Sequence, residues 1–319
     1  HAPAPIEIES VGTYAAQLLA AKVIVSSADR RAIIDAGAAK AAAAKGLTVI
    51  PDAGLVAENA GLTEWPVPML GAFDPAFLAV PREVIQLTMR TNQKYFACAD
   101  STGALAPNFV CVANLLASDG GVAIVAGNER VLSARLSDAK FFWDQDVQVV
   151  KAGGLEAFLP KLGDIVFHEK LGTVADKVER VTKLARWLVE SGAVKGDPDL
   201  AEQAAKLCKA DLVSATVGEF PEVQGIAGAY LARVARLDPQ VADAIRDHYK
   251  PVGQGDDVPT APVSVAVALA DKLDTLVGFF ALRMPPTGSR DPFALRRAAL
   301  GIMQILQFVG VRLALSEVI

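Results

Sequence analysis

The chain contains 319 residues, of which 52% are hydrophobic and 21% are charged. This composition excludes a disordered or fibrous protein. The net charge of −5 excludes a uniformly basic nucleic-acid-binding protein, although a local basic patch is compatible with it. The three cysteines form no C-x-x-C pair, so we expect reduced thiols, a cytoplasmic protein and no cysteine-based zinc site. No run of about 20 apolar residues is present, so no membrane span is expected.

The length corresponds to two domains, at roughly 100–200 residues per domain. The chain starts at His1 rather than at a methionine, and Val311–Ile319 still has the half-apolar pattern of ordered chain. We therefore expect both ends to lie inside a longer protein.

The first half of the chain predicts an α+β region. Short β-branched runs bounded by Gly and Pro are typical of strands, and Pro81 suits the first turn of a helix. Asp100–Gly103 has the composition of a hairpin turn. In chain order, the patterns predict a strand over 22–26, a helix over 28–44, strands over 67–73 and 77–80, a helix over 81–89, and a hairpin of strands 95–99 and 109–114.

After about Gly121 the patterns are helical only. Apolar residues from Val174 to Leu188 recur at spacings of three and four, as on an amphipathic helix. Helices are predicted over 124–142, 174–188, 200–217, 241–249, 263–282 and 292–308. We therefore expect a multidomain α and β protein, with an α+β domain over 1–145 and an all-α domain over 146–319.

Charge is unevenly distributed in the second half. Residues 189–274 contain eight Lys/Arg against 14 Asp/Glu, whereas residues 283–312 contain five Arg against one Asp. Within this basic stretch, Arg290, Arg296 and Arg297 suit phosphate, because a guanidinium group matches phosphate oxygens in a bidentate fork. The alternative is a solvated helix face paired with acidic neighbours. Ser289 or Asp291 is expected to cap the following helix.

Motifs for nucleotide binding and hydrolysis are absent. The sequence has no G-x-x-x-x-G-K-[ST] loop, no G-x-G-x-x-G after a strand and no G-x-S-x-G elbow. Only three histidines are present, His1, His168 and His248. His248 is expected at the surface or at the C-terminus of a helix, with its hydrogen bonds satisfied.

His168, Asp211 and Asp271, each expected on a different helix, resemble in their order the metal ligands of HD-type phosphohydrolases. In that family, imidazole and carboxylate ligands converge on a divalent metal. The family's His–Asp pair falls here on Ala210–Asp211, so one imidazole is missing. We therefore expect a helical domain of this shape without a metal. The alternatives are a metal-dependent phosphohydrolase, or carboxylates that make helix-surface ion pairs and caps.

Longer sequence strings identify a protein family more specifically than these three positions do. In order and spacing they closely resemble the β subunit of the bacterial tetrameric glycyl-tRNA synthetase, over almost the whole chain and least over His1–Ala44. The strings that carry the resemblance are Thr88–Phe96, Leu105–Val110, Val125–Trp143, Lys170–Thr173, Lys209–Leu212, Glu219–Gly225, Ala268–Thr275 and Ser289–Gly301.

The resemblance implies an α2β2 assembly. The α subunit would carry the class II site that uses ATP and Mg²⁺ to form glycyl-adenylate and charge glycine tRNA. The β subunit would supply tRNA recognition and be required for aminoacylation. The resemblance places a domain like the editing-type domain of the phenylalanyl-tRNA synthetase β subunit over 1–145 and an HD-like helical domain over 146–319. It implies no catalytic residue, metal or cofactor on this chain, and leaves the family's N-terminal portion and anticodon-binding domain outside it.

Three groups of polar residues are candidates for contact with tRNA, because long cationic and amide side chains reach phosphates and 2′-hydroxyls, and an aromatic ring can stack on a base. The alternative for each group is intramolecular salt bridges or contact with the α subunit, and the chain would then be a purely structural subunit. The candidates are Arg90, Asn92, Gln93, Lys94 and Tyr95, then Asn128, Arg130, Arg135 and Lys140, and finally Arg290, Arg296 and Arg297.

Overall fold

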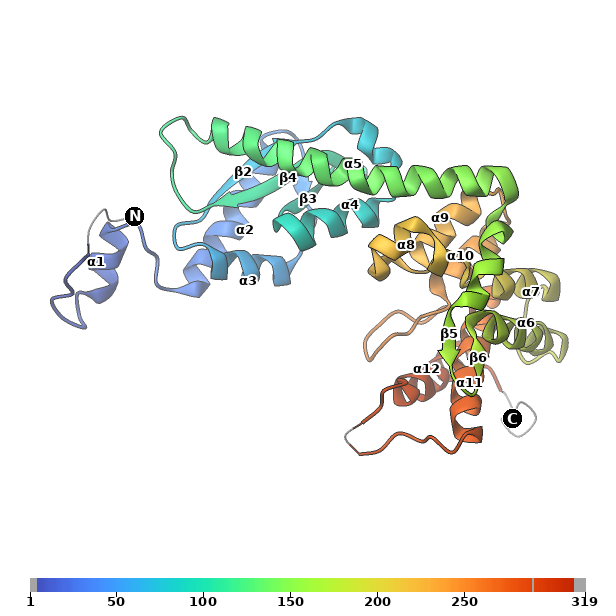
Figure 1. Ribbon diagram of the computed structural model, residues 1–319. Coiled ribbons are helices and arrows are strands. Elements are labelled where there is room, and N and C mark those ends of the chain that lie inside the picture. Colours follow the sequence, from blue (N-terminus) through green and yellow to red (C-terminus); the bar gives the residue numbers. More distant parts are fainter. Residues whose placement is uncertain (1–4, 289, 313–319) are drawn as a thin grey trace. The chain divides into compact units, whose positions relative to one another are not determined.

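The computed structural model describes residues 5–288 and 290–312, so Ser289, one of the two expected helix caps, lies outside the described residues. The chain divides into two compact units, His1–Phe141 (unit 1) and Phe142–Ile319 (unit 2). The long helix α5, Val122–Gly153, contains the junction between them (Figure 1). In the part of the chain that is described, no helix combines the length and apolar character needed to cross a membrane.

Unit 1 is built on a four-stranded antiparallel sheet with the strand order β1-β3-β4-β2. The predicted hairpin is confirmed, because β3 and β4 pair directly. Its turn is fixed by Asp100, whose Oδ1 accepts hydrogen bonds from the N–H groups of Thr102 and Ala104 at 2.8 and 3.1 Å. The strands are β1 (Thr48–Val49), β2 (Val67–Ala72), β3 (Phe96–Ala99) and β4 (Leu105–Ala113).

Helices α2 and α3 pack on one face of this sheet. Each begins at a side chain that accepts a backbone N–H, Ser26 for α2 and Asp52 for α3. The core between these helices and the sheet includes the buried side chains of Ile34, Leu55 and Phe96. The helical segments of unit 1 before α5 are α1 (Tyr14–Ala20), α2 (Ser27–Ala43), α3 (Ala53–Leu62), the 3-10 helix η1 (Pro75–Ala79), α4 (Arg82–Thr88) and the π-helix η2 (Met89–Gln93).

Two predicted strands of unit 1 are wrong. The segment 22–26 is irregular, because the Arg30 guanidinium donates to the carbonyls of Ile24 and Val25 that a neighbouring strand would otherwise satisfy. Residues 77–80 lie in and just after η1. Asp74 accepts the N–H of Ala76 there, and the proline between them favours a helical turn over an extended strand.

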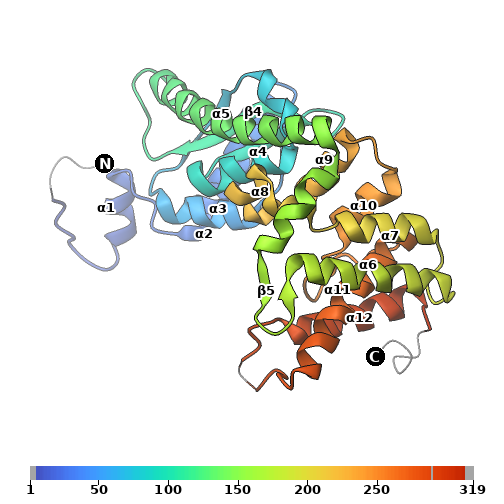
Figure 2. The same cartoon turned by 45° about the vertical axis from the view of Figure 1, so that its right-hand side comes forward.

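Unit 2 is mainly helical, with α6, α7, α10 and α11 packed against one another and α12 against α11 (Figure 2). Val174, Val178, Val181, Ala185 and Leu188 are buried, which confirms the amphipathic pattern of α6. The helical segments are η3 (Leu155–Asp164), α6 (Val174–Glu190), α7 (Pro198–Leu207), η4 (Ala210–Val213), α8 (Ala215–Glu219), η5 (Pro221–Val223), α9 (Ile226–Val234), α10 (Pro239–Asp247), α11 (Pro262–Ala281) and α12 (Leu295–Val309).

The all-α prediction for this half is wrong in one respect, because unit 2 also contains a two-stranded antiparallel hairpin. Its strands are β5 (Val166–His168) and β6 (Gly172–Thr173). Gly172, the first residue of β6, adopts a φ of +84°, which favours glycine. With two and three residues, these strands are too short to show an alternating pattern in the sequence.

Gly71 gives a direct test of packing in unit 1. It pairs with Phe109 across β2 and β4, and a Cβ at this position would lie 2.5 Å from the Phe109 ring. We expect Gly71→Ala to lower the free energy of unfolding by about 1–3 kcal/mol through overpacking. Gly127→Ala is the matched control, because a Cβ there meets nothing within 4 Å and alanine favours the helix. Chemical denaturation of both variants measures the difference, and equal stabilities would contradict this packing.

Candidate functional site

Two of the predicted tRNA-contact residues meet inside unit 1. Tyr95 is 5% exposed, and its ring stacks on Phe109 with 4.7 Å between the ring centroids. Its hydroxyl donates to Oδ1 of Asn128 in α5, and Nδ2 of Asn128 donates to the carbonyl of Ile124 at 2.8 Å. Burial raises the pKa of Tyr95 to about 12, so the hydroxyl remains a donor at neutral pH. The suggestion that Tyr95 stacks on a base is therefore corrected, because its ring belongs to the core.

The neighbouring cations are paired with acidic residues of α3 and its cap. Nε of Arg90 lies 2.6 Å from Oδ2 of Asp52, and Nζ of Lys94 lies 2.7 Å from Oε1 of Glu58. Lys94 has a left-handed φ of +59° directly after the π-helix η2. The two remaining amides of this group, Asn92 and Gln93, are exposed and partly buried respectively. Contact of this group with tRNA stays a prediction.

Four predicted arginines are exposed, and their side chains make neither an ion pair nor a hydrogen bond with a described residue. They are Arg130 and Arg135 on α5, and Arg290 and Arg297 before and within the first turn of α12. Lys140, also on α5, is only partly exposed and has an intramolecular interaction. The structure thus distinguishes cations that face solvent without a partner from cations that are already paired.

Arg296 folds back onto its own loop. Its guanidinium donates to the carbonyls of Thr287 and Gly288. Asp291 accepts the backbone N–H groups of Leu295 and Arg296 at 2.8 and 3.0 Å, which confirms it as a cap at the start of α12. Arg296 therefore helps to hold the loop that precedes α12.

The three positions that resemble HD-type ligands are not brought together. His168 lies on strand β5 rather than at the start of a helix, and its ring packs edge-on against Phe279 and Phe293 at 5.2 and 5.5 Å. Phe279 and Asp271 are both on α11, eight residues or about 12 Å apart along the helix axis, so the ring of His168 packs on a part of α11 away from Asp271. No three His, Cys, Asp or Glu side chains within residues 5–288 and 290–312 are grouped to hold a metal ion.

Asp211 acts as a buried cap. It is the second residue of the short 3-10 helix η4, rather than lying inside a longer helix as predicted, and it is 0% exposed. Its Oδ2 accepts the N–H groups of Gly225 and Gly228 at 2.6 and 3.0 Å, at the start of α9. Its Oδ1 has no hydrogen-bond partner among the described residues. Burial raises the pKa of Asp211 to about 6, although the two N–H groups oppose this shift.

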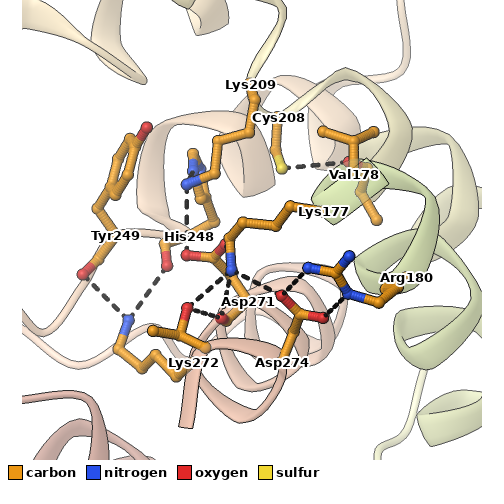
Figure 3. A network of polar contacts seen from close by, with 12 residues as sticks. Lys177, Val178, Arg180, Cys208, Lys209, His248, Tyr249, Asp271, Lys272 and Asp274 are labelled. Carbon is orange, nitrogen blue, oxygen red and sulfur yellow. Dashed lines mark hydrogen bonds and ion pairs between the residues drawn. The ribbon is translucent and has the colours of Figure 1, made fainter. Parts of the chain in front are cut away.

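Asp271 lies within a buried group of charged side chains (Figure 3). Nζ of Lys177, from α6, is 3.2 Å from its Oδ1, and Nζ of Lys209, between α7 and η4, is 3.3 Å from its Oδ2. Lys177 also contacts Asp274 at 3.0 Å and donates to Thr275 Oγ1 at 2.7 Å. Burial alone would raise the pKa of Asp271, but the attraction of Lys177 and Lys209 holds it well below its usual range.

His248 belongs to the same group. Its predicted place at the C-terminus of a helix, with its hydrogen bonds satisfied, is confirmed, whereas the alternative place at the surface is wrong. It is 0% exposed at the C-terminal end of α10. Its Nε2 lies 2.8 Å from Nζ of Lys209, and its Nδ1 lies 2.7 Å from the carbonyl of Ile245. Because an ammonium group can only donate, Nε2 accepts and Nδ1 carries the proton. Burial lowers the pKa of His248 well below its ordinary value, and the charge of Lys209 adds to this effect. We call Lys177, Lys209, His248, Asp271 and Asp274 the lysine–carboxylate network.

Lys272 is a third buried lysine beside this network. Its Nζ donates to the carbonyls of His248, Tyr249 and Lys250 at 3.2, 3.0 and 2.8 Å. Burial lowers the pKa of Lys272 to about 8. Three consecutive carbonyls therefore bind one ammonium group where the chain leaves α10.

Sequence reasoning did not identify these lysines. One signal was present at Lys177, which follows Val174 by three residues and precedes Val181 by four, and so lies on the apolar stripe of α6. A cation in that position requires a buried counter-charge. No comparable pattern marks Lys209, because it lies outside a regular helix.

Asp211 predicts a pH dependence. Its pKa is raised on folding, so its contribution to stability is present below about pH 4 and is lost as the pH rises through about 6. We expect the free energy of unfolding of Asp211→Asn, relative to that of the wild type, to increase by up to about 3 kcal/mol as the pH rises from 4 to 7. Thermal unfolding across this range measures the difference, with Asp238→Asn at an exposed helix cap as control. A difference that is constant with pH would contradict the shift.

Comparison with known proteins identifies the family. A family model described as glycyl-tRNA synthetase beta subunit matches residues 1–319. The chain is 54% identical over 314 residues to the glycine–tRNA ligase beta subunit of Rhodospirillum centenum, covering 98% of this chain and 43% of that protein. The corresponding protein of Paracoccus denitrificans is 51% identical over 316 residues, covering 99% and 46%. The chain thus spans less than half the length of these relatives. It belongs to the glycyl-tRNA synthetase beta subunit family.

Proposed function

We propose that this chain forms part of the β subunit of a glycine–tRNA ligase in the cytoplasm. It supports ATP-dependent formation of glycyl-tRNA by binding glycine tRNA and a catalytic α subunit in an α2β2 assembly. The observation that supports this function is similarity to curated β subunits over nearly the whole chain, rather than over a short motif. ATP and Mg²⁺ act at the α subunit in this proposal.

The proposed tRNA contacts are two groups of arginines, each within one unit: Arg130 and Arg135 on α5 in unit 1, and Arg290 and Arg297 at α12 in unit 2. These side chains are exposed and have no ion-pair partner among the described residues, so contact with phosphate would not require breaking an internal pair. Asn92 is an exposed amide that could add a 2′-hydroxyl contact. Arg90 and Lys94 would have to leave Asp52 and Glu58 to contribute fully.

We further propose that unit 1 corresponds to the editing-type domain and unit 2 to the HD-like helical domain of the family. The antiparallel sheet with α2 and α3 supports the first correspondence, and the mainly helical unit 2 supports the second. A phosphohydrolase function is not favoured, since His168, Asp211 and Asp271 each have other partners.

The function is tested by aminoacylation. Full-length β subunit is mixed with its α subunit, tRNA, ATP and labelled glycine. We expect charging by both subunits together to exceed charging by α alone by orders of magnitude, because the α subunit then depends on β for productive tRNA binding. Equal charging by α alone would refute the proposal.

The tRNA surface is tested by removing two charges from α5. In the full-length α2β2 enzyme, we expect Arg130→Ala with Arg135→Ala to weaken tRNA binding. We also expect the slope of log K against log salt concentration to decrease in magnitude by roughly 1–2. The matched control is Arg31→Ala with Arg82→Ala, two exposed arginines of unit 1 outside the proposed surface. Titration of labelled tRNA at several salt concentrations measures both. An unchanged salt slope, or the same loss in the control, would favour a purely structural role for this face.

A further inference from the structure

We propose that the ammonium groups of Lys209 and Lys177 take the place of a metal ion in unit 2, where they neutralise Asp271 and join α11 to α6, α10 and η4. The proposal rests on the side-chain atoms that accept hydrogen bonds from Lys209. Its Nζ lies between a carboxylate oxygen of Asp271 at 3.3 Å and Nε2 of His248 at 2.8 Å, and it lies 3.8 Å from the centroid of the Tyr249 ring (Figure 3). An imidazole nitrogen and a carboxylate oxygen are ligands of divalent transition metals, and here both face a lysine.

The orientation of His248 strengthens this comparison. Its Nδ1–H donates to the backbone carbonyl of Ile245, which leaves the lone pair of Nε2 directed at Lys209. Metal-bound histidines commonly use the same arrangement, with the second ring nitrogen donating to a backbone carbonyl. The ring is thus fixed as a ligand, and the group that it binds is an ammonium.

The other side of Asp271 is occupied by a second cation. Lys177 lies 3.2 Å from Oδ1 of Asp271 and 3.0 Å from Asp274, and Nε of Arg180 lies 2.6 Å from the other oxygen of Asp274. Two carboxylates are therefore balanced by three cations. A divalent cation at Asp271 would be repelled by two ammonium groups in a region of low dielectric constant.

This arrangement differs from the donor set expected from the HD-type resemblance. His168 packs on aromatic rings, and Asp211 caps α9, so neither is available to a cation at Asp271. The histidine that does face the cation is His248, which the sequence pattern does not select. A covalently attached cation also makes the packing of these helices independent of metal supply.

The test compares metal dependence in the full-length β subunit. Wild type is expected to contain no stoichiometric divalent metal by elemental analysis, and its Tm is expected to be the same with EDTA, Zn²⁺ or Co²⁺. Lys209→Met keeps the length of the side chain but removes its charge, so we expect Tm to fall by about 5–15 °C. Lys206→Met, at an exposed position of α7, is the control and should leave Tm unchanged.

Lys209→Ala tests whether the ammonium group of Lys209 occupies a place where a metal ion could bind. It leaves the His248 and Asp271 donors and opens space between them. We expect a Co²⁺ absorption spectrum and a Co²⁺-dependent rise in Tm, both lost in Lys209→Ala with His248→Ala. A folded Lys209→Ala variant that gains no Co²⁺ binding would overturn the proposal. If Lys209→Ala does not fold, the wild type decides, because bound metal or a lower Tm in EDTA would also overturn it.

Discussion

The packing of unit 2 depends on the charge of one buried carboxylate. Asp271 is in the middle of α11, and its counter-charges come from α6 and from the segment before η4, so α11 has to be placed where both ammonium groups reach it. The adjacent Lys272 extends the constraint in two directions. It binds three carbonyls at the end of α10, and its Cε passes so close to α12 that a Cβ on Gly301 would lie 2.8 Å away. A buried ion pair adds little over an apolar contact of equal volume, yet removal of one partner costs about 3–5 kcal/mol. We infer that the lysine–carboxylate network selects the arrangement of these helices more than it increases their stability.

Unit 1 contains an uncharged counterpart to this constraint. Phe109 packs against Gly71 on one side and stacks on the ring of Tyr95 on the other. The hydroxyl of Tyr95 in turn donates to Asn128 on α5. Nearby, Oε1 of Glu129 accepts the N–H of Ala72 at 2.8 Å, so α5 also satisfies the end of β2. Two strings that carry the family resemblance, Thr88–Phe96 and Val125–Trp143, are therefore joined by an internal hydrogen bond, from Tyr95 to Asn128. Residues that identify a family can thus be selected for packing, and membership in a string is a weak guide to which side chains contact a ligand.

The sequence predicted elements well where one segment carries its own signal. The apolar stripe of α6 and the Asp100 turn between β3 and β4 are local patterns, and both are confirmed. It failed where the outcome depends on a side-chain contact that no local pattern marks. Residues 22–26 have the composition of a strand but face the Arg30 guanidinium, and His168 pairs with aromatic rings from residues more than 100 positions away. The lysine–carboxylate network could not be predicted for the same reason. Its members come from positions 177, 209, 248, 271 and 274, and only the fold brings them within hydrogen-bond distance.

Burial also changes what the charge distribution means. Counted along the chain, residues 189–274 are strongly acidic, but Asp211, Asp271 and Asp274 are buried and do not contribute an exposed carboxylate. The same holds for the cations, since Lys177, Lys209 and Lys272 point inward and contribute little to the surface potential. In the basic stretch near α12, Arg296 is exposed but binds its own loop, while Arg290 and Arg297 are exposed without such contacts. Attraction of a polyanion depends on charges at the surface, because only these exchange counter-ions with it. Of the residues predicted to contact tRNA, those that are exposed without an internal partner are therefore fewer than the sequence count indicates, namely Arg130 and Arg135 on α5 and Arg290 and Arg297 at α12.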